Sequence, residues 1–152
     1  MIVGLLRIAI KFRKFKINII SNLLEGIIFL ISGARISSDI SLGEKTKFAY
    51  NGMSCLIVKG TVIGKSCLIG ARVTTGRKFP YRKVPKIGNN VFIGFNSSII
   101  GPVEIEDDVI IAPHTLVNKN IPKGSIVAGI PFKIIGKTES LNYNIFDNEK
   151  YL

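Results

Sequence analysis

Apolar residues return every six positions through most of this chain. From residue 57 to residue 117 the residues at this spacing are Ile57, Ile63, Ile69, Thr75, Tyr81, Ile87, Ile93, Ile99, Ile105, Ile111 and Val117. An amphipathic helix repeats near 3.6 residues and a strand near 2, so a sustained period of six requires a backbone that turns in an equivalent way every six residues. The pattern predicts a mainly β solenoid of short strands, with three hexads in each triangular coil and the isoleucines pointing inward.

Two further positions repeat with the same period. Glycine follows the apolar residue at positions 64, 70, 76, 88 and 94, and we expect its conformational freedom to permit the corner of the coil. Small or apolar residues stand four positions after the apolar residue: Thr61, Cys67, Val73, Val91, Ser97, Val103, Val109, Thr115 and Ile121. Cys55 and Cys67 fall at equivalent positions, which predicts buried small side chains.

The ladder is interrupted twice. Ile36, Leu42 and Phe48 are six apart, but the step from residue 48 to residue 57 is not a multiple of six, which predicts a bulge in AYNGMSCL. Between residues 76 and 87 the phase is kept, yet RKFPYRKVPK lacks the pattern and contains two prolines. We expect this segment to leave the coil as a loop, and loops on a regular scaffold commonly carry function.

Residues 1–34 have a different character, predicting a helical segment before the solenoid of residues 35–137. Arg7, Lys11 and Lys14 lie at helical spacing beside an apolar surface, a basic amphipathic pattern. Glu25 and neighbouring polar residues argue against a membrane span, because an acidic residue at a bilayer midplane costs about 2.5–3.5 kcal/mol. Helices that cover the end of the solenoid, and an interfacial helix on anionic lipid, are compatible interpretations. We expect the polar residues 138–152 to form a short helix or a strap.

Composition narrows the function. The 152 residues carry a formal net charge of +11, which favours an anionic partner. No nucleic-acid reading motif is present, so we expect no nucleic-acid partner. Cys55, Cys67 and His114 cannot supply four N/S ligands, so no zinc site is expected. The apolar stretch lacks the charge order and cleavage site of a secretory signal, which predicts a cytoplasmic protein, with membrane contact at the inner face as an option.

The run VPKIGNNVFIGFNSSIIGPVEIEDDVIIAPHTLVNKNIPKGSIVAGIPFKIIG resembles the left-handed β-helix acyltransferases. Within them, residues 36–137 are most similar to the serine acetyltransferase-like and capsule or exopolysaccharide O-acetyltransferase branch. The resemblance implies a left-handed parallel β-helix and a homotrimer. It also implies that acetyl-CoA lies between neighbouring solenoids, where an acceptor hydroxyl attacks the thioester directly.

The family uses a histidine as the base for that hydroxyl, a group worth about 10²–10⁴ in rate. In the polysaccharide branch this histidine begins a segment that matches NGMSCLIVKGTVIG, so its position here is Asn51. Serine acetyltransferases carry a second histidine before P-K-I-G, and that position is Val84. Neither side chain accepts a proton at pH 7. The single histidine, His114, is predicted on an outward face, stacked on Asn96, and is the weaker candidate base.

The resemblance also implies where coenzyme A binds. The matching positions are Phe95, Pro113, Asn118, Lys119 and Lys133. The two lysines fit a phosphate-bearing ligand, whereas Phe95 adds bulk and Pro113 removes an N–H donor where the family has small residues. Packing in a trimer contact is the other interpretation of Phe95 and Pro113. The basic, aromatic loop is expected to cap coenzyme A or an anionic acceptor, or to be simply solvated.

The leading expectation is an acetyl-CoA-dependent O-acetyltransferase that modifies a sugar hydroxyl in cell-surface polysaccharide biosynthesis, with a small molecule or a glycan as acceptor. Three alternatives remain. The chain could be a serine O-acetyltransferase-like enzyme, a catalytically degenerate trimeric scaffold that lacks the family's histidine base, or a solenoid that binds polyanions.

Overall fold

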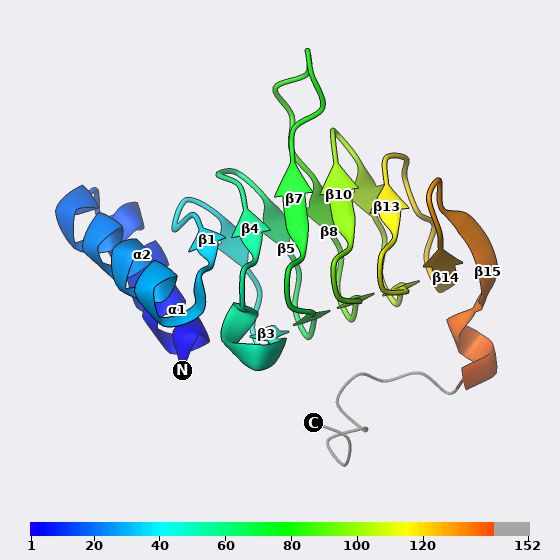
Figure 1. Cartoon of the computed structure of the whole chain (residues 1–152), viewed down its shortest axis with the longest axis horizontal. Coiled ribbons are helices and arrows are strands. Elements are labelled where there is room, and N and C mark those ends of the chain that lie inside the picture. The colour runs from blue at the N-terminus through cyan, green and yellow to red at the C-terminus, as the bar shows by residue number, and fades with distance from the viewer. Residues whose placement is uncertain (142–152) are drawn as a thin grey trace.

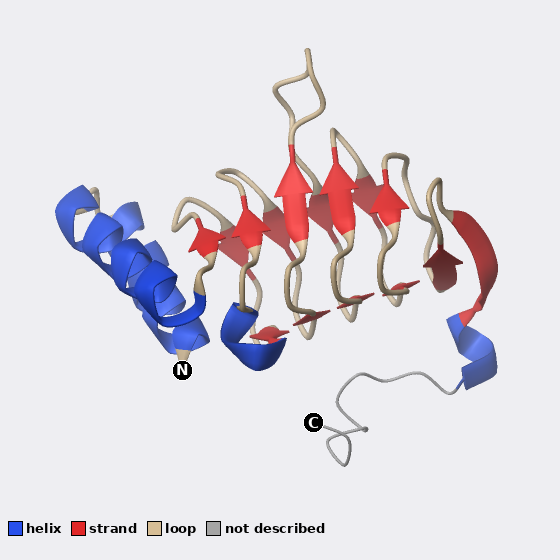
Figure 2. Cartoon of the chain, in the orientation of Figure 1, coloured by secondary structure: helices blue, strands red, loops and turns tan. Residues whose placement is uncertain are grey.

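The computed structural model describes residues 1–141, which form a helical hairpin followed by a β-solenoid (Figure 1). The hairpin consists of α1 (Ile2–Lys14) and α2 (Asn18–Ser32). The solenoid has three flat sides, which we name sheets A, B and C, and Figure 2 shows how short the strands are relative to the turns between them.

Each sheet collects strands from successive coils. Sheet A contains β1 (Arg35–Ile36), β4 (Leu56–Ile57), β7 (Thr74–Gly76), β10 (Ser98–Ile100) and β13 (Leu116–Val117). Sheet B contains β2 (Ser41–Leu42), β5 (Val62–Ile63), β8 (Lys86–Ile87) and β11 (Glu104–Ile105). Sheet C contains β3 (Lys47–Phe48), β6 (Leu68–Ile69), β9 (Phe92–Ile93), β12 (Ile110–Ile111), β14 (Ser125–Ala128) and β15 (Lys133–Lys137).

Strands of successive coils pair in parallel, and their register confirms the predicted solenoid. Leu56 pairs with Thr74, and Ser98 with Leu116, so one coil is 18 residues long at these places. The hexad residues line the interior: apart from Tyr81, none of those between Ile57 and Val117 exposes more than 3% of its surface. The second column, which includes Cys55 and Cys67, is buried as well. The predicted mainly β fold with a helical N-terminal segment is confirmed.

The two predicted interruptions are insertions at corners. Arg35 pairs with Leu56, a step of 21 residues, because a 3₁₀ segment, η1 (Ala49–Gly52), adds three residues after β3. Thr74 pairs with Ser98, a step of 24 residues, because residues 77–85 between β7 and β8 project from the coil (Figure 1). One whole hexad is therefore inserted there. Tyr81, which keeps the hexad phase in the sequence, is 56% exposed and lies outside the core.

The repeated glycines serve close packing between coils rather than the corner conformation expected from the sequence. A Cβ atom on Gly94 would lie 2.5 Å from the backbone nitrogen of Pro113, and one on Gly64 would lie 2.3 Å from the carbonyl oxygen of Gly88. Neither glycine has a positive φ. The left-handed corner positions are taken instead by other residues, namely Lys45, Ser66, Arg72, Asn90, Asn96, Asp108 and His114. Asn, Asp and His are the non-glycine residues most tolerant of this conformation.

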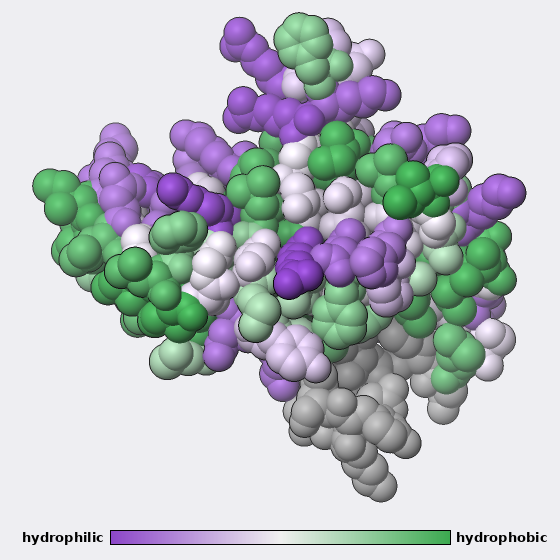
Figure 3. Space-filling view, in the orientation of Figure 1, coloured by the Kyte–Doolittle hydropathy of each residue, from purple (hydrophilic) through white to green (hydrophobic). Residues whose placement is uncertain are grey.

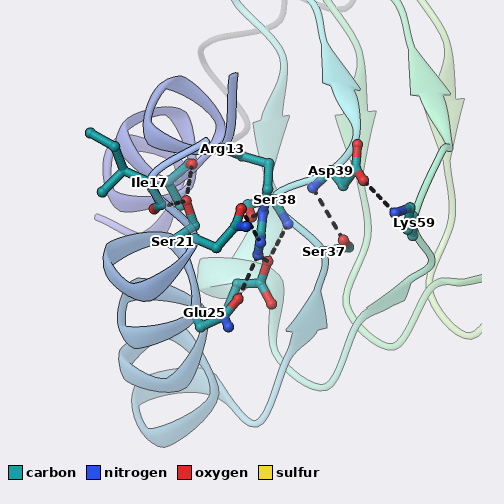
Figure 4. A network of polar contacts seen from close by, with 11 residues as sticks. Arg13, Ile17, Ser21, Glu25, Ser37, Ser38, Asp39 and Lys59 are labelled. Atoms are coloured by element: carbon teal, nitrogen blue, oxygen red, sulfur yellow. Dashed lines mark hydrogen bonds and ion pairs between the residues drawn. The ribbon is translucent and has the colours of Figure 1, made fainter. Parts of the chain in front are cut away.

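The helical hairpin covers the first coil through a buried apolar face and a polar network. Ile2, Leu6 and Ile28 join the core of the solenoid. Glu25 Oε1 accepts hydrogen bonds from Arg13 at 3.2 Å and from the backbone N–H of Ser38 at 2.6 Å (Figure 4). Arg7, one of the basic residues of α1, also joins the hairpin to the solenoid, because it donates to the carbonyl oxygen of Gly43 at 2.8 Å.

The C-terminal part of the solenoid departs from parallel pairing. β15 turns back and pairs antiparallel with β14, and η2 (Thr138–Leu141) follows it. The helix or strap predicted over residues 138–152 falls mostly outside the described residues.

Substitution of Gly94 by alanine tests the close approach of the coils. We expect Gly94→Ala to lower the free energy of unfolding by about 1–3 kcal/mol, because the new Cβ atom forces adjacent backbones apart. Gly26→Ala is the matched control: nothing lies within 4 Å of its added Cβ atom, and alanine in the middle of a helix stabilises by about 0.5–1 kcal/mol. Urea unfolding at one protein concentration compares the two, and equal effects would contradict the packing argument.

Candidate active site

Asn51, where the resemblance places the family's histidine, lies on a strained turn at the corner between sheets C and A. Tyr50, Asn51 and Gly52 have φ values of +48°, +52° and +62°, so three consecutive residues adopt the left-handed conformation. Such strain costs of order 1–3 kcal/mol for each non-glycine residue and is typical of functional sites. Space at Gly52 is also limited, since a Cβ atom there would lie 2.8 Å from Ile2 Cδ1 of α1 and would displace that methyl group.

The same corner carries a stack of exposed side chains, which we call the corner ridge: Tyr50, Asn51, Arg72, Phe95, Asn96, Pro113 and His114. Backbone hydrogen bonds fix its order. Arg72 donates to Met53, Asn96 to Ala71, and His114 to Phe95, so each step climbs one coil. An aromatic contact also stabilises the corner ridge, because the ring centroids of Tyr50 and Phe95 lie 6.0 Å apart, within the range of favourable aromatic pairs.

His114 is remote from Asn51. It lies three coil spacings along the ridge, about 14 Å at the 4.7–4.9 Å separation of neighbouring strands. Its Nε2 atom is 3.4 Å from Asn96 Nδ2, as expected from the 18-residue spacing of the two residues. The two candidate base positions, Asn51 and His114, therefore cannot serve one reacting hydroxyl in the same subunit.

The remaining predicted positions lie on the opposite edge of sheet A or beyond it. Asn118 and Lys119 follow β13 at the corner between sheets A and B, and Val84 lies in the loop that projects from this corner. Lys133 begins β15 and pairs with Ala128. Within one chain, sheet A separates Phe95 and Pro113 from Asn118 and Lys119, so this structure does not bring the predicted coenzyme site together.

One buried polar atom on this edge lacks a partner. Among residues 1–141, Asn118 Oδ1 and Ser125 Oγ are the buried side-chain oxygens without a hydrogen bond. Buried polar atoms are nearly always bonded, so an unsatisfied carbonyl oxygen suits a ligand that brings an N–H donor. Lys119, the next residue, is exposed and offers a cation beside it.

Comparison with known proteins places this chain among the hexapeptide-repeat proteins. Family models match in two places: "Bacterial transferase hexapeptide (six repeats)" at residues 85–119 and "Hexapeptide repeat of succinyl-transferase" at residues 60–76. The serine acetyltransferase of Helicobacter pylori is 30% identical over 133 residues, which cover 86% of this chain and 77% of that protein. The chain belongs to the hexapeptide-repeat acyltransferases, in their serine acetyltransferase-like branch.

Other relatives of this branch are longer. The serine acetyltransferase of Synechococcus elongatus is 30% identical over 122 residues, 79% of this chain but 50% of that protein. The chain spans about half the length of the first curated relatives that it matches. The crystal structure of Neisseria gonorrhoeae serine acetyltransferase superimposes with a TM-score of 0.84 at 23% identity, over 90% of this chain and 54% of that one. That of the Brucella abortus enzyme in complex with coenzyme A gives 0.82 at 26% identity, over 90% and 55%.

Cys55 and Cys67 are buried inside the solenoid and take no part in the candidate site. Cys55 Sγ donates to the carbonyl oxygen of Gly70 at 3.3 Å, and Cys67 Sγ to that of Gly88 at 3.1 Å. Burial raises the pKa of both thiols above the ordinary value, so they stay protonated and unreactive at neutral pH. Residues 1–141 contain no group of three or more His, Cys, Asp and Glu side chains placed to hold a metal ion.

Two features near the candidate site were missed by sequence reasoning. The Tyr50–Phe95 contact joins coils that are not neighbours, and the six-residue period of the sequence does not predict it. A basic groove beneath the projecting loop combines Lys59 of one coil with Arg77, Arg82 and Lys83 of the loop. Asn51-Gly52 was a detectable sign of the left-handed turn, since Asn-Gly pairs are a common turn signal.

Proposed function

We propose that this protein is an acetyl-CoA-dependent O-acetyltransferase that acts on the hydroxyl of a small acceptor. Membership of the serine acetyltransferase-like branch supports the acetyl donor. Among acceptors, the relatives favour serine, the alternative in the sequence interpretation, over the sugar hydroxyl expected first. The relatives described above do not support a role in polysaccharide biosynthesis.

The observation that carries the proposal is the division of the site between the two edges of sheet A. Asn51 and Phe95 lie at one edge, and Asn118, Lys119 and Val84 at the other. If neighbouring subunits set opposite edges against each other, one edge supplies Asn51 and the other supplies the coenzyme contacts. The division therefore supports the homotrimer and the intersubunit groove that the family resemblance implies.

Coenzyme A supplies an acetyl thioester in such a site. Lys119 and Lys133 would neutralise its phosphates, and the unpaired Asn118 Oδ1 would accept a hydrogen bond from an amide N–H of its pantetheine arm. Asn51 can hold the acceptor hydroxyl by a hydrogen bond, but it cannot remove the proton. We therefore expect slow turnover, limited by the absence of a placed base. A catalytically degenerate scaffold is the second candidate, and the residues Asn51 and Val84 favour it.

The direct test is release of coenzyme A from acetyl-CoA in the presence of L-serine, free sugars or nucleotide sugars. We expect L-serine to stimulate release above the rate of spontaneous hydrolysis. Stimulation by a sugar and not by serine would overturn the serine assignment and restore the sugar hydroxyl. If no acceptor stimulates release while coenzyme A still binds by calorimetry, the degenerate scaffold is correct.

Restoring the base separates an impaired enzyme from a scaffold. Asn51→His is compatible with the φ of +52°, because histidine is enriched among non-glycine residues in this conformation. We expect the substitution to raise the rate toward the limit of about 10²–10⁴-fold for a placed general base. His114→Ala is the control and should leave the wild-type rate unchanged. Loss of activity in His114→Ala would instead make His114 the base.

The trimer is tested by multi-angle light scattering at micromolar concentration. We expect a mass of three times 16.7 kDa, because the predicted site is incomplete within one chain. A stable species of one chain's mass would contradict both the trimer and the intersubunit groove.

Contact with an anionic membrane is a separate proposal about the helical hairpin. Phe15, Ile19, Leu23 and Leu30 expose between 63% and 85% of their surface, and Figure 3 shows the resulting hydrophobic area over the helices. Ile19, Leu23 and Leu30 share one face of α2, since they are four and seven residues apart. Glu25 is the only acidic residue before Arg35, and its carboxylate already accepts hydrogen bonds from Arg13 and from the backbone N–H of Ser38. The exposed remainder is apolar and cationic, which suits an anionic lipid surface.

No helix among residues 1–141 is long and apolar enough to span a bilayer, so vesicle binding is expected to be peripheral. Co-sedimentation should show binding to phosphatidylcholine vesicles that contain phosphatidylserine, and weaker binding to phosphatidylcholine alone. Leu23→Glu/Leu30→Glu should abolish binding, whereas Ile135→Glu, on the exposed strand β15, should not. If the double variant changes the oligomer mass and no vesicle binds the wild type, the face is a contact between copies.

A further inference from the structure

The loop of residues 77–85 and the corner beneath it enclose a groove of about 570 Å³, within the usual range for small-molecule sites. The loop leaves sheet A after β7 and returns at β8, and Figure 1 shows it projecting from the body. Lys78 of the loop lies close to the next coil, since a Cβ atom added to Gly101 would lie 3.0 Å from Lys78 Cβ. Val62, Val84 and Val103 contribute an apolar lining.

The polar lining of the groove is almost entirely cationic. Five basic residues and one acidic residue contribute: Lys59, Arg77, Arg82, Lys83, Lys86 and Glu104. Figure 3 shows strongly hydrophilic side chains, in purple, on the projecting loop. A cleft lined by charges of one sign attracts counter-charged ligands more strongly than the same charges spread over a surface.

Four of the five cations of the groove have no carboxylate partner among residues 1–141. Lys59 pairs with Asp39 at 2.8 Å (Figure 4), but among residues 1–141 no carboxylate pairs with Arg77, Arg82, Lys83 or Lys86. The one acid of the groove, Glu104, also makes no ion pair with them. Four unpaired cations in one groove exceed what a single carboxylate would neutralise.

We propose that this groove binds the phosphate or diphosphate group of a substrate. Two arginines supply planar, bidentate donors that match phosphate oxygens, and Lys83 and Lys86 add point charges. Asn120 contributes amide donors, because its Oδ1 already accepts the backbone N–H of Glu104 at 2.9 Å. The inference rests on the proposed function in taking the ligand to be a substrate of acetyl transfer. That substrate is either a phosphorylated acceptor, in place of the free serine that the relatives favour, or coenzyme A itself.

Calorimetric titration of the wild-type protein with inorganic pyrophosphate tests the site. We expect one pyrophosphate per chain, with an affinity that falls as salt is added. Arg82→Ala/Lys83→Ala should weaken binding about tenfold or more, since hydrogen bonds to charged groups are among the strong ones. Lys11→Ala/Lys14→Ala removes the same charge from α1, far from the groove, and should change the affinity less than about threefold.

Repeating the titration with saturating coenzyme A distinguishes the two sources of phosphate. If pyrophosphate still binds, and Arg82→Ala/Lys83→Ala leaves the affinity for coenzyme A unchanged, the groove serves a phosphorylated acceptor. If coenzyme A displaces pyrophosphate and the same variant weakens both, the groove holds the coenzyme's phosphates. No binding by the wild type, or equal weakening by the two double variants, would overturn the site.

These measurements do not depend on turnover. A protein that binds pyrophosphate in the groove but transfers no acetyl group would retain this inference and lose the proposed function. A protein that acetylates L-serine but binds no pyrophosphate would do the reverse.

Discussion

Successive coils of this protein are held 4.7–4.9 Å apart by parallel backbone hydrogen bonds, and every other feature depends on that spacing. A coil that deviates in its strands would lose hydrogen bonds on both sides. Additional residues are therefore tolerated only between strands, and the chain places three at the corner that contains Asn51 and six in the basic loop. Both insertions lie at edges of sheet A, where the candidate chemistry also lies. The regular part of the sequence thus provides the scaffold, and its irregular part provides the site.

The coil spacing also explains why glycine recurs where adjacent coils come closest. Gly64 and Gly94 lie so close to the coil above that even a methyl group would collide with backbone atoms. Thr75 fills a hexad position with a polar side chain because its hydroxyl donates to or accepts from Thr61 at 3.1 Å, and it also accepts the N–H of Val58. A polar side chain can therefore lie in the interior where a neighbouring coil supplies a hydrogen-bond partner.

Much of the fold could be predicted from the sequence, because a six-residue period has few structural solutions. The isoleucine column, the buried cysteines, the bulge and the loop followed directly from spacing. The function of the glycines did not, because spacing shows where a residue recurs but not whether φ or a neighbouring coil requires it. The contact of Arg7 was not predicted either, because helical spacing shows which residues share a face but not that the carbonyl oxygen of Gly43 lies opposite that face. The site was harder still, since Asn51 and Val84 are 33 positions apart in sequence and lie at different corners.

The two ends of the solenoid are closed in different ways, and this has a consequence for assembly. A stack of parallel strands exposes unpaired N–H and C=O groups at each end, to which the opposite end of a second stack could add. Here the helical hairpin covers the first coil, and β15 reverses direction against β14. An antiparallel last strand presents the wrong polarity to an incoming parallel coil. The protein is therefore protected against head-to-tail growth into fibres, while its lateral faces stay available for closed, finite association.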